Sequence, residues 1–580
     1  MKGRLYSFLA VVTILFFAFL AGFALLHPGL PPTHDGEYHV IRFYEFDKTL
    51  RDDDWYPRWA PDLNNGFGIP LFNYVYPLPN YFSFILHLFG VSFIDAFKLN
   101  MFFATIIGSA FFYLWAREFW GTMGGVVSSV FYTFSPYHFV EIYIRGSVGE
   151  VWALAFFPAF LWAFTRFVKN KQKIFLAFSS LFLALIIFSH NILALMFFFF
   201  ALSYIVFLIA QVTNKKYLIL NTLHLILISL GLSSIFWLPA ILESNLVKGL
   251  EIFDLTAHFP DLYQLLIPSW GSGFSGESLN NQLSFQIGIA NLLAVLLSIL
   301  LVTFKICNFR IFRHSGERSD SRIKNRFWTR RVPDGNPSSQ NDGKASAVIF
   351  FLVFFFFTFF LMLKASQPIW NNAPLMNYFQ FPWRFLSLEI IFSSFLAGSI
   401  IYFCKSKILA IFLILLTFSL GIGYTKPAYY HYRDDNYYLT RSNFIDGTNS
   451  PGNVFNTIFF KTDLKKQKEK LFFLEGSGKI NQEIVKSTRY AFDIKAEKDS
   501  EIRVNTAYFP GWVIKLDGKR IKPKIASSGL FSFSIPEGQH LVEIKFTDTP
   551  ARIIGAFGFI LSSFILIALS IRVVFATIRR

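Results

Sequence analysis

The stretch SFLAVVTILFFAFLAGFALLHPGLPPTHDGEYH, residues 7–39, places an apolar run just before a cluster of histidines and acids. Its first 20 residues match the ~20 that an α-helix needs to cross a bilayer. The run exceeds the ~7–15 residue core of a secretory signal and lacks a small-residue cleavage site before His27, so we expect a retained membrane helix. Lys2 and Arg4 in front of it favour a cytoplasmic N-terminus.

Composition places most of the chain in lipid. The sequence has 580 residues, of which 53% are hydrophobic and 16% charged, and 76 are Phe. Such a composition excludes a soluble enzyme, a fibre and a disordered chain. The net charge of +17 is explained by Lys and Arg in cytoplasmic loops, so we expect no nucleic-acid partner.

Hydropathy predicts twelve membrane helices, and the eleven that follow the first span about 97–116, 121–138, 150–168, 174–190, 192–211, 217–239, 284–304, 346–363, 385–403, 408–424 and 552–574. With this count, the main basic clusters and both termini fall on one side, which the bias of Lys and Arg identifies as the cytoplasm. The sequence therefore predicts a multi-pass protein of the inner (cytoplasmic) membrane, with its N- and C-termini in the cytoplasm.

Two stretches interrupt this pattern. The segment Pro79 to Phe93 is apolar but short and bounded by proline, so it is interpreted as a re-entrant or interfacial helix in the outer loop 27–96. The segment 305–344 is polar, basic and rich in Ser, Asn, Asp and Gly. We expect it to be a disordered cytoplasmic insertion.

The fold class that follows is a polytopic α-helical membrane protein with an extracytoplasmic β domain near its C-terminus. Residues 1–424 form the transmembrane domain, 425–551 the extracytoplasmic domain, and 552–580 the last helix with a cytoplasmic tail. Five short alternating stretches with Asp-Gly and Pro-Glu-Gly turns predict a small antiparallel β-sandwich in the second half of the outer domain, at 487–495, 501–505, 511–516, 530–535 and 540–546.

Polar motifs gather at the outer ends of the predicted helices, namely His34-Asp35-Gly36-Glu37-Tyr38-His39, Arg145 to Glu150, Ser189-His190-Asn191 and Phe381-Pro382-Trp383-Arg384. Together they supply carboxylates for general base or divalent-cation chemistry, arginines suited to phosphate, and histidines. Each motif also has a structural explanation: a helix cap at Asp35, an anchor and helix-start carboxylate at Arg145 and Glu150, a turn at His190-Asn191, and a snorkelling Arg384.

The arrangement resembles known families. A first span, an outer loop with an acid close to the membrane, many further spans and an outer β domain resemble the GT-C superfamily of glycosyltransferases, which use polyprenyl-phosphate-linked sugars. The four polar motifs are similar to bacterial membrane proteins labelled 6-pyruvoyl-tetrahydropterin synthase-related. The string Tyr508-Phe509-Pro510-Gly511-Trp512 resembles the C-terminal domain of YfhO-type proteins. Pterin chemistry is not implied, because the sequence shows no zinc-binding histidine cluster.

The resemblance implies roles for individual residues. Asp35 matches the acid that serves as catalytic base or metal contact in GT-C enzymes, and Glu150 is the second catalytic candidate. The usual acidic pair is replaced by Asp35-Gly36-Glu37, which leaves the need for a divalent cation, Mg²⁺ or Mn²⁺, open. The expected substrate-binding residues are His34, His39, Arg145, His190, Asn191, Trp383 and Arg384.

The function that we expect is a membrane glycosyltransferase. It would move a sugar from a polyprenyl phosphate to a glycan, lipid or protein acceptor at the extracytoplasmic face, with Asp35 deprotonating the acceptor and Arg145 and Arg384 holding the phosphate. The alternatives are a flippase or transporter of a lipid-linked glycan, and a non-catalytic factor for envelope polysaccharide assembly. A transporter would place ionisable groups near the bilayer midplane, whereas the predicted spans are nearly free of charge.

Overall fold

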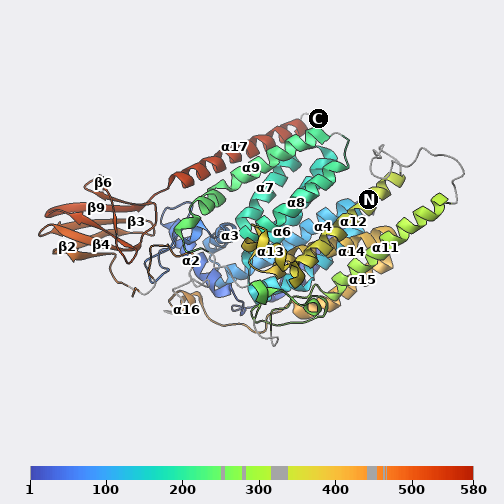
Figure 1. Cartoon of the computed structure of the whole chain (residues 1–580), viewed down its shortest axis with the longest axis horizontal. Coiled ribbons are helices and arrows are strands. Elements are labelled where there is room, and N and C mark those ends of the chain that lie inside the picture. The colour runs from blue at the N-terminus through green and yellow to red at the C-terminus, as the bar shows by residue number, and fades with distance from the viewer. Residues whose placement is uncertain are drawn as a thin grey trace.

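The computed structural model describes residues 2–213, 215–249, 255–276, 282–314, 337–440, 454–461, 464–465 and 467–578. The molecule is an elongated helical bundle with two β-sheets at one end and both chain termini at the other (Figure 1). This arrangement agrees with the predicted topology, in which the termini share the side opposite the β domain.

The bundle consists of long apolar helices. In the described part of the chain, nine are long and apolar enough to cross a membrane, and two shorter apolar helices accompany them. Their bounds are α1 (Lys2–Gly22), α4 (Phe93–Thr133), α6 (Val148–Asn170), α7 (Lys173–Ser189), α8 (Asn191–Ala210), α9 (Lys215–Leu242), α11 (Ile289–His314), α12 (Pro337–Met362), α14 (Leu386–Cys404), α15 (Lys407–Gly421) and α17 (Pro550–Ile578).

Helix α4 contains two of the predicted spans. At Gly121 the backbone leaves the helical region, with φ 72° and ψ −179°, and the chain turns back on itself. Across the turn, Ser129 Oγ donates to Ser109 O at 2.7 Å, and the rings of Phe112 and Tyr132 stack with centroids 4.4 Å apart. The described helices therefore account for all twelve predicted spans.

The side of the bundle that carries the β domain also carries shorter helices, namely α2 (Gly36–Arg51), α3 (Leu78–Leu88), α5 (Pro136–Phe139), α10 (Leu262–Leu266), α13 (Gln367–Asn372) and α16 (Asp435–Thr440). Helix α3 occupies the stretch predicted to be re-entrant or interfacial, and its C-terminal end exposes Ile85, Leu88 and Phe89. At the opposite face, α11 and α12 extend into the segment predicted as a disordered insertion, and residues 315–336 of that segment lie outside the described residues.

The β domain consists of two antiparallel sheets with the strand orders β1-β4-β8-β7 and β2-β3-β9-β5-β6. The strands are β1 (Leu471–Glu475), β2 (Gly478–Val485), β3 (Arg489–Ala496), β4 (Ser500–Ala507), β5 (Trp512–Leu516), β6 (Lys519–Ile521), β7 (Lys524–Ile525), β8 (Leu530–Ile535) and β9 (Gly538–Phe546). Their alternating inward side chains share one core with Trp59 and Phe67 of the first outer loop. The predicted C-terminal β region is confirmed, and β1, β2, β6 and β7 add to the five predicted strands.

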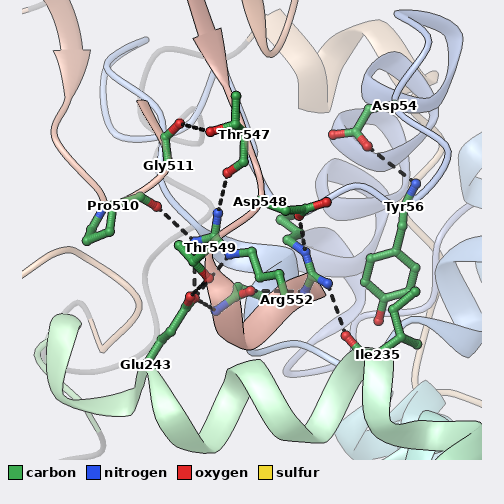
Figure 2. A network of polar contacts seen from close by, with 12 residues as sticks. Asp54, Tyr56, Ile235, Glu243, Pro510, Gly511, Thr547, Asp548, Thr549 and Arg552 are labelled. Atoms are coloured by element: carbon green, nitrogen blue, oxygen red, sulfur yellow. Dashed lines mark hydrogen bonds and ion pairs between the residues drawn. The ribbon is translucent and has the colours of Figure 1, made fainter. Parts of the chain in front are cut away.

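A buried polar network joins the β domain to the bundle (Figure 2). Arg552, in the first turn of α17, donates from Nη2 to Glu243 Oε2 at 3.0 Å and to Pro510 O at 3.0 Å. Its Nη1 donates to Thr547 O at 3.1 Å. Arg58 of the first outer loop pairs with Asp548 at 3.7 Å. The network therefore fixes the sheets, α9, α17 and the first outer loop relative to one another.

Candidate functional site

A short irregular segment before α6 carries the centre of the site. Residues Val140–Arg145 form a π-helical turn that ends at Gly146, whose φ is 68°. A Cβ at Gly146 would lie 2.3 Å from Thr33 Oγ1, so glycine permits the close approach of the first outer loop. π-Helical turns often occur at functional sites, and this one directs two charged side chains, Glu141 and Arg145, into the protein.

Arg145 is held by two carboxylates. Its Nη1 donates to both oxygens of Glu141, at 2.6 and 2.7 Å, and its Nη2 donates to Glu150 Oε1 at 2.7 Å. Both carboxylates are fully buried. The indole ring of Trp383 covers the guanidinium, with its centroid 4.9 Å from Cζ. The charge of Arg145 is thus compensated by the protein itself.

Glu150 is shared by two further predicted residues. Arg384 Nε lies 3.3 Å from Glu150 Oε1, and His190 Nε2 lies 3.7 Å from the same oxygen. His190 Nδ1 accepts from the Leu193 backbone N–H at 3.2 Å, which places the proton of a neutral ring on Nε2, facing the carboxylate. Arg384 Nη1 donates to Phe379 O at 3.1 Å. Residues from three distant parts of the sequence therefore meet at one carboxylate.

Asp35 is fixed next to this cluster through its backbone. The N–H of His34 donates to Ile144 O, and the N–H of Asp35 donates to Arg145 O, both at 2.9 Å. Asp35 occupies the N-cap position of α2, but its side chain makes no capping bond. Within the described part of the chain, the Asp35 carboxylate has no hydrogen bond or ion pair. Asp35 is thus available for chemistry in a way that Glu141 and Glu150 are not.

The remaining predicted residues surround this centre. His39 is buried between the rings of Phe97 and Phe43, where burial, followed by the charge of Arg42, lowers its pKa. Asn191 Nδ2 donates to Tyr74 O at 3.1 Å and so attaches the α7–α8 turn to the first outer loop. His34 faces another outer segment, with Nε2 donating to Ser272 O at 2.8 Å.

Sequence reasoning missed several parts of the site. Glu141 lies four residues before Arg145, a spacing at which helical side chains meet, and this signal could have identified the pair. The outer segment 255–288 gave no comparable signal. It reaches the site through His258, whose ring lies 4.8 Å from Phe381, and through Phe285, 5.9 Å from Trp383.

The carboxylates do not fit a metal site built from protein ligands. Among the described residues, no three His, Cys, Asp or Glu side chains are grouped so that they could hold a metal ion. Glu141 and Glu150 are already bound to Arg145, which leaves Asp35 as the available carboxylate of this cluster. Mg²⁺ in proteins is commonly bound by one or two carboxylates together with substrate phosphates, so Asp35 is the residue that would hold a divalent cation. The steps proposed below assign no role to such an ion.

Comparison with known proteins identifies two families. The family described as "6-pyruvoyl-tetrahydropterin synthase related domain; membrane protein" matches residues 72–426. The family described as "Bacterial membrane protein YfhO" matches residues 474–557. A curated relative from Lactococcus lactis subsp. cremoris, an uncharacterized protein, is 27% identical over 257 residues. These residues make up 42% of this chain and 41% of that protein, so the match spans about two fifths of the relative.

Two solved structures match this chain at low similarity. Arabinofuranosyltransferase AftD from Mycobacteria is 15% identical with a TM-score of 0.42, and the match covers 73% of this chain and 28% of AftD. The oligosaccharyltransferase of Archaeoglobus fulgidus is 13% identical with a TM-score of 0.38, and the match covers 72% of this chain and 56% of that enzyme.

Proposed function

The chain belongs to the 6-pyruvoyl-tetrahydropterin synthase related membrane proteins, and on that premise we propose that it is a glycosyltransferase using a polyprenyl-phosphate-linked sugar. The acceptor is a glycan, lipid or protein at the extracytoplasmic face of the inner membrane. The observation that carries the proposal is the carboxylate of Asp35, which no described residue binds, beside a buried cluster of arginines at the outer end of a membrane bundle.

The reaction gives the residues separate roles. The Asp35 carboxylate accepts the proton of an acceptor hydroxyl, and the resulting oxygen attacks the anomeric carbon of the donor sugar. The bond between that carbon and the phosphate oxygen breaks, and polyprenyl phosphate leaves with the electron pair. Arg384, which shares one carboxylate oxygen with two other groups, stabilises the leaving phosphate.

Arg145 and Glu150 support this reaction indirectly. Because Arg145 is bound by two carboxylates, we assign it a positioning role: its backbone holds Asp35 and its side chain fixes Glu150. Glu150 orients Arg384 and His190. His39 and Asn191 maintain the shape of the first outer loop. Trp383 covers the Arg145 guanidinium and limits access of water to the ion pairs.

The test is transfer of radiolabelled sugar from a panel of polyprenyl-phosphate donors in membranes carrying wild type, Asp35→Asn or Asp95→Asn at matched expression. Asp95 lies in the first turn of α4 and is half exposed, so Asp95→Asn controls for the loss of an outer-face carboxylate. We expect transfer to fall about 10²–10⁴-fold in Asp35→Asn and to be unchanged in Asp95→Asn. Equal transfer by all three would remove Asp35 from the mechanism, whereas no transfer from any donor in the wild type would contradict the transferase and favour a flippase.

A further inference from the structure

Helix α2 presents a third arginine to the site. Asp35, His39 and Arg42 are separated by four and three residues, which places them on one face of the helix. Tyr76 lies near this face: burial raises its pKa, and the charges of Arg42, Asp35, Glu150 and Arg145 act on its hydroxyl. The ring of Tyr76 is 5.1 Å from that of His190. Arg42 therefore lies on the same side of α2 as the proposed base and near the same tyrosine.

Arg42 differs from the other arginines of the first outer loop. Arg51 pairs with Asp47 at 2.7 Å, and Arg58 pairs with Asp548. Arg42 makes no hydrogen bond, ion pair or ring contact with any described residue, and its Nε is buried without a partner. Buried donors are nearly always paired, and an unmade bond from a charged donor is costly. A guanidinium with an unpaired buried donor can bind a negatively charged hydrogen-bond acceptor on a ligand.

The charges around Arg42 favour an anion. Glu141 and Glu150 compensate Arg145, and Arg384 shares Glu150. His39, whose pKa is lowered chiefly by burial, is neutral near pH 7 and does not compete for an anion. Arg42 is therefore the arginine of this site that no described carboxylate compensates.

We infer that Arg42 binds the phosphate of the polyprenyl-phosphate donor. Its planar guanidinium donates hydrogen bonds to two phosphate oxygens, and Arg42 and Arg384 together stabilise the leaving phosphate. This inference rests on the proposed function, and it names the residue that recognises the ligand's phosphate. It also separates the arginines by role, because Arg145 holds the protein together whereas Arg42 and Arg384 contact the ligand.

The first experiment measures binding of decaprenyl monophosphate in detergent micelles as an upward shift in the melting temperature of the full chain. Unphosphorylated decaprenol and inorganic phosphate are the comparison ligands, and the variants are Arg42→Gln, Arg42→Lys and Arg51→Gln. Arg51→Gln removes an ion-paired arginine from the same helix. We expect Arg42→Gln to bind decaprenyl monophosphate about ten-fold more weakly than wild type, or weaker still. Arg42→Lys should have an intermediate affinity, and Arg51→Gln should have the affinity of wild type.

Arg42 has no partner among the described residues, so we expect Arg42→Gln without ligand to melt no lower than wild type, and this measurement controls for misfolding. Decaprenol binding equal to that of decaprenyl monophosphate, or normal phosphate binding by Arg42→Gln, overturns the inference. If inorganic phosphate binds as well as decaprenyl monophosphate and depends on Arg42 in the same way, the claim that the bound phosphate belongs to a lipid is contradicted.

Transfer assays separate the inference from the proposed function. We expect Arg42→Gln to raise KM for the donor more than it lowers kcat, whereas Asp35→Asn acts mainly on kcat. Binding that depends on Arg42 without transfer from any donor supports the phosphate site and contradicts the transferase. Transfer with an unchanged KM in Arg42→Gln contradicts the phosphate site and leaves the transferase standing.

Discussion

At the residue scale, the three arginines of the site are distinguished by their partners. Arg145 has two carboxylates within hydrogen-bond distance, Arg384 shares one, and Arg42 has none among the described residues. Removing one partner of a buried ion pair leaves an uncompensated charge in a poorly solvated place. Replacing each of the three arginines in turn should therefore distinguish an effect on stability from an effect on ligand binding.

We expect Arg145→Gln to destabilise the protein by about 3–5 kcal/mol, because Glu141 and Glu150 would stay buried without their cation. Arg145→Lys should recover little of this loss, because an ammonium cannot bond both carboxylates in the same plane. Thermal unfolding in detergent measures the effect. Asp35→Asn is the control, since its carboxylate has no described partner. An Arg145→Gln protein that melts like wild type would contradict the structural role of the cluster.

At the element scale, the string Tyr508 to Trp512 forms part of the joint between the β domain and the bundle. Pro510 O accepts from Arg552, and Gly511 O accepts from the Thr547 N–H at 2.8 Å (Figure 2). Gly511 has φ +123°, and a Cβ there would lie 2.6 Å from Thr547 O. Trp512 packs edge-on against Trp59 of the first outer loop. This part of the YfhO-like region therefore has an architectural explanation.

Arg552→Met should weaken this joint, by about 3–5 kcal/mol, because Glu243 would keep its buried charge without a partner. Limited proteolysis of purified protein should then release the β domain faster than from wild type. Adding Glu243→Gln should recover part of the loss, since it removes the uncompensated carboxylate. Exposed Arg489, which faces Glu543 at 3.4 Å, gives the control: Arg489→Gln should change stability by no more than ~1 kcal/mol.

Helix α2 contributes a pH dependence through Glu45. Burial and the neighbouring Asp62 raise the pKa of Glu45 from 4.5 to about 8. The folded protein thus keeps a proton that the unfolded chain loses above pH 4.5, so this contribution to stability is present below that value and is lost as the pH rises through about 8. Glu45→Gln should be most stabilising, relative to wild type, at pH 8 and least at pH 5.

Melting curves across this pH range test the effect, with Glu543→Gln as the control for an exposed carboxylate. A constant difference between Glu45→Gln and wild type over the range would show that Glu45 does not titrate there.

At the scale of the whole molecule, the sheets and the chain termini lie at opposite ends of the bundle (Figure 1). Free Cys404, exposed at the end of α14, should be labelled by a membrane-impermeant maleimide in inverted vesicles and protected in spheroplasts. Lys519→Cys, in the β5–β6 hairpin, should show the reverse pattern. Both measurements use a Cys307→Ser background. Labelling of both positions from the same side would contradict the predicted orientation.

The sequence predicted the fold more completely than the site. Each membrane helix carries its own apolar signal, and the hairpin at Gly121 was visible because hydropathy separated its two arms. The short strands β6 and β7 were missed because they have few residues over which to alternate. The motifs around Asp35, Arg145, His190 and Arg384 were found individually. Apart from Glu141 and Arg145, whose spacing of four residues indicates a pair, the division into paired and unpaired charges depends on tertiary distances.

The local pairing of Arg145 has a consequence for biosynthesis. Its counter-ions lie four residues before it and five after it, so the three charged side chains emerge from the ribosome together and can enter the membrane as one compensated unit. Arg384 and Trp383 are made more than 230 residues later. A nascent chain thus carries this compensated cluster while about two fifths of the protein is synthesised, and the site is complete only when α14 is inserted, after about two thirds of the protein exists.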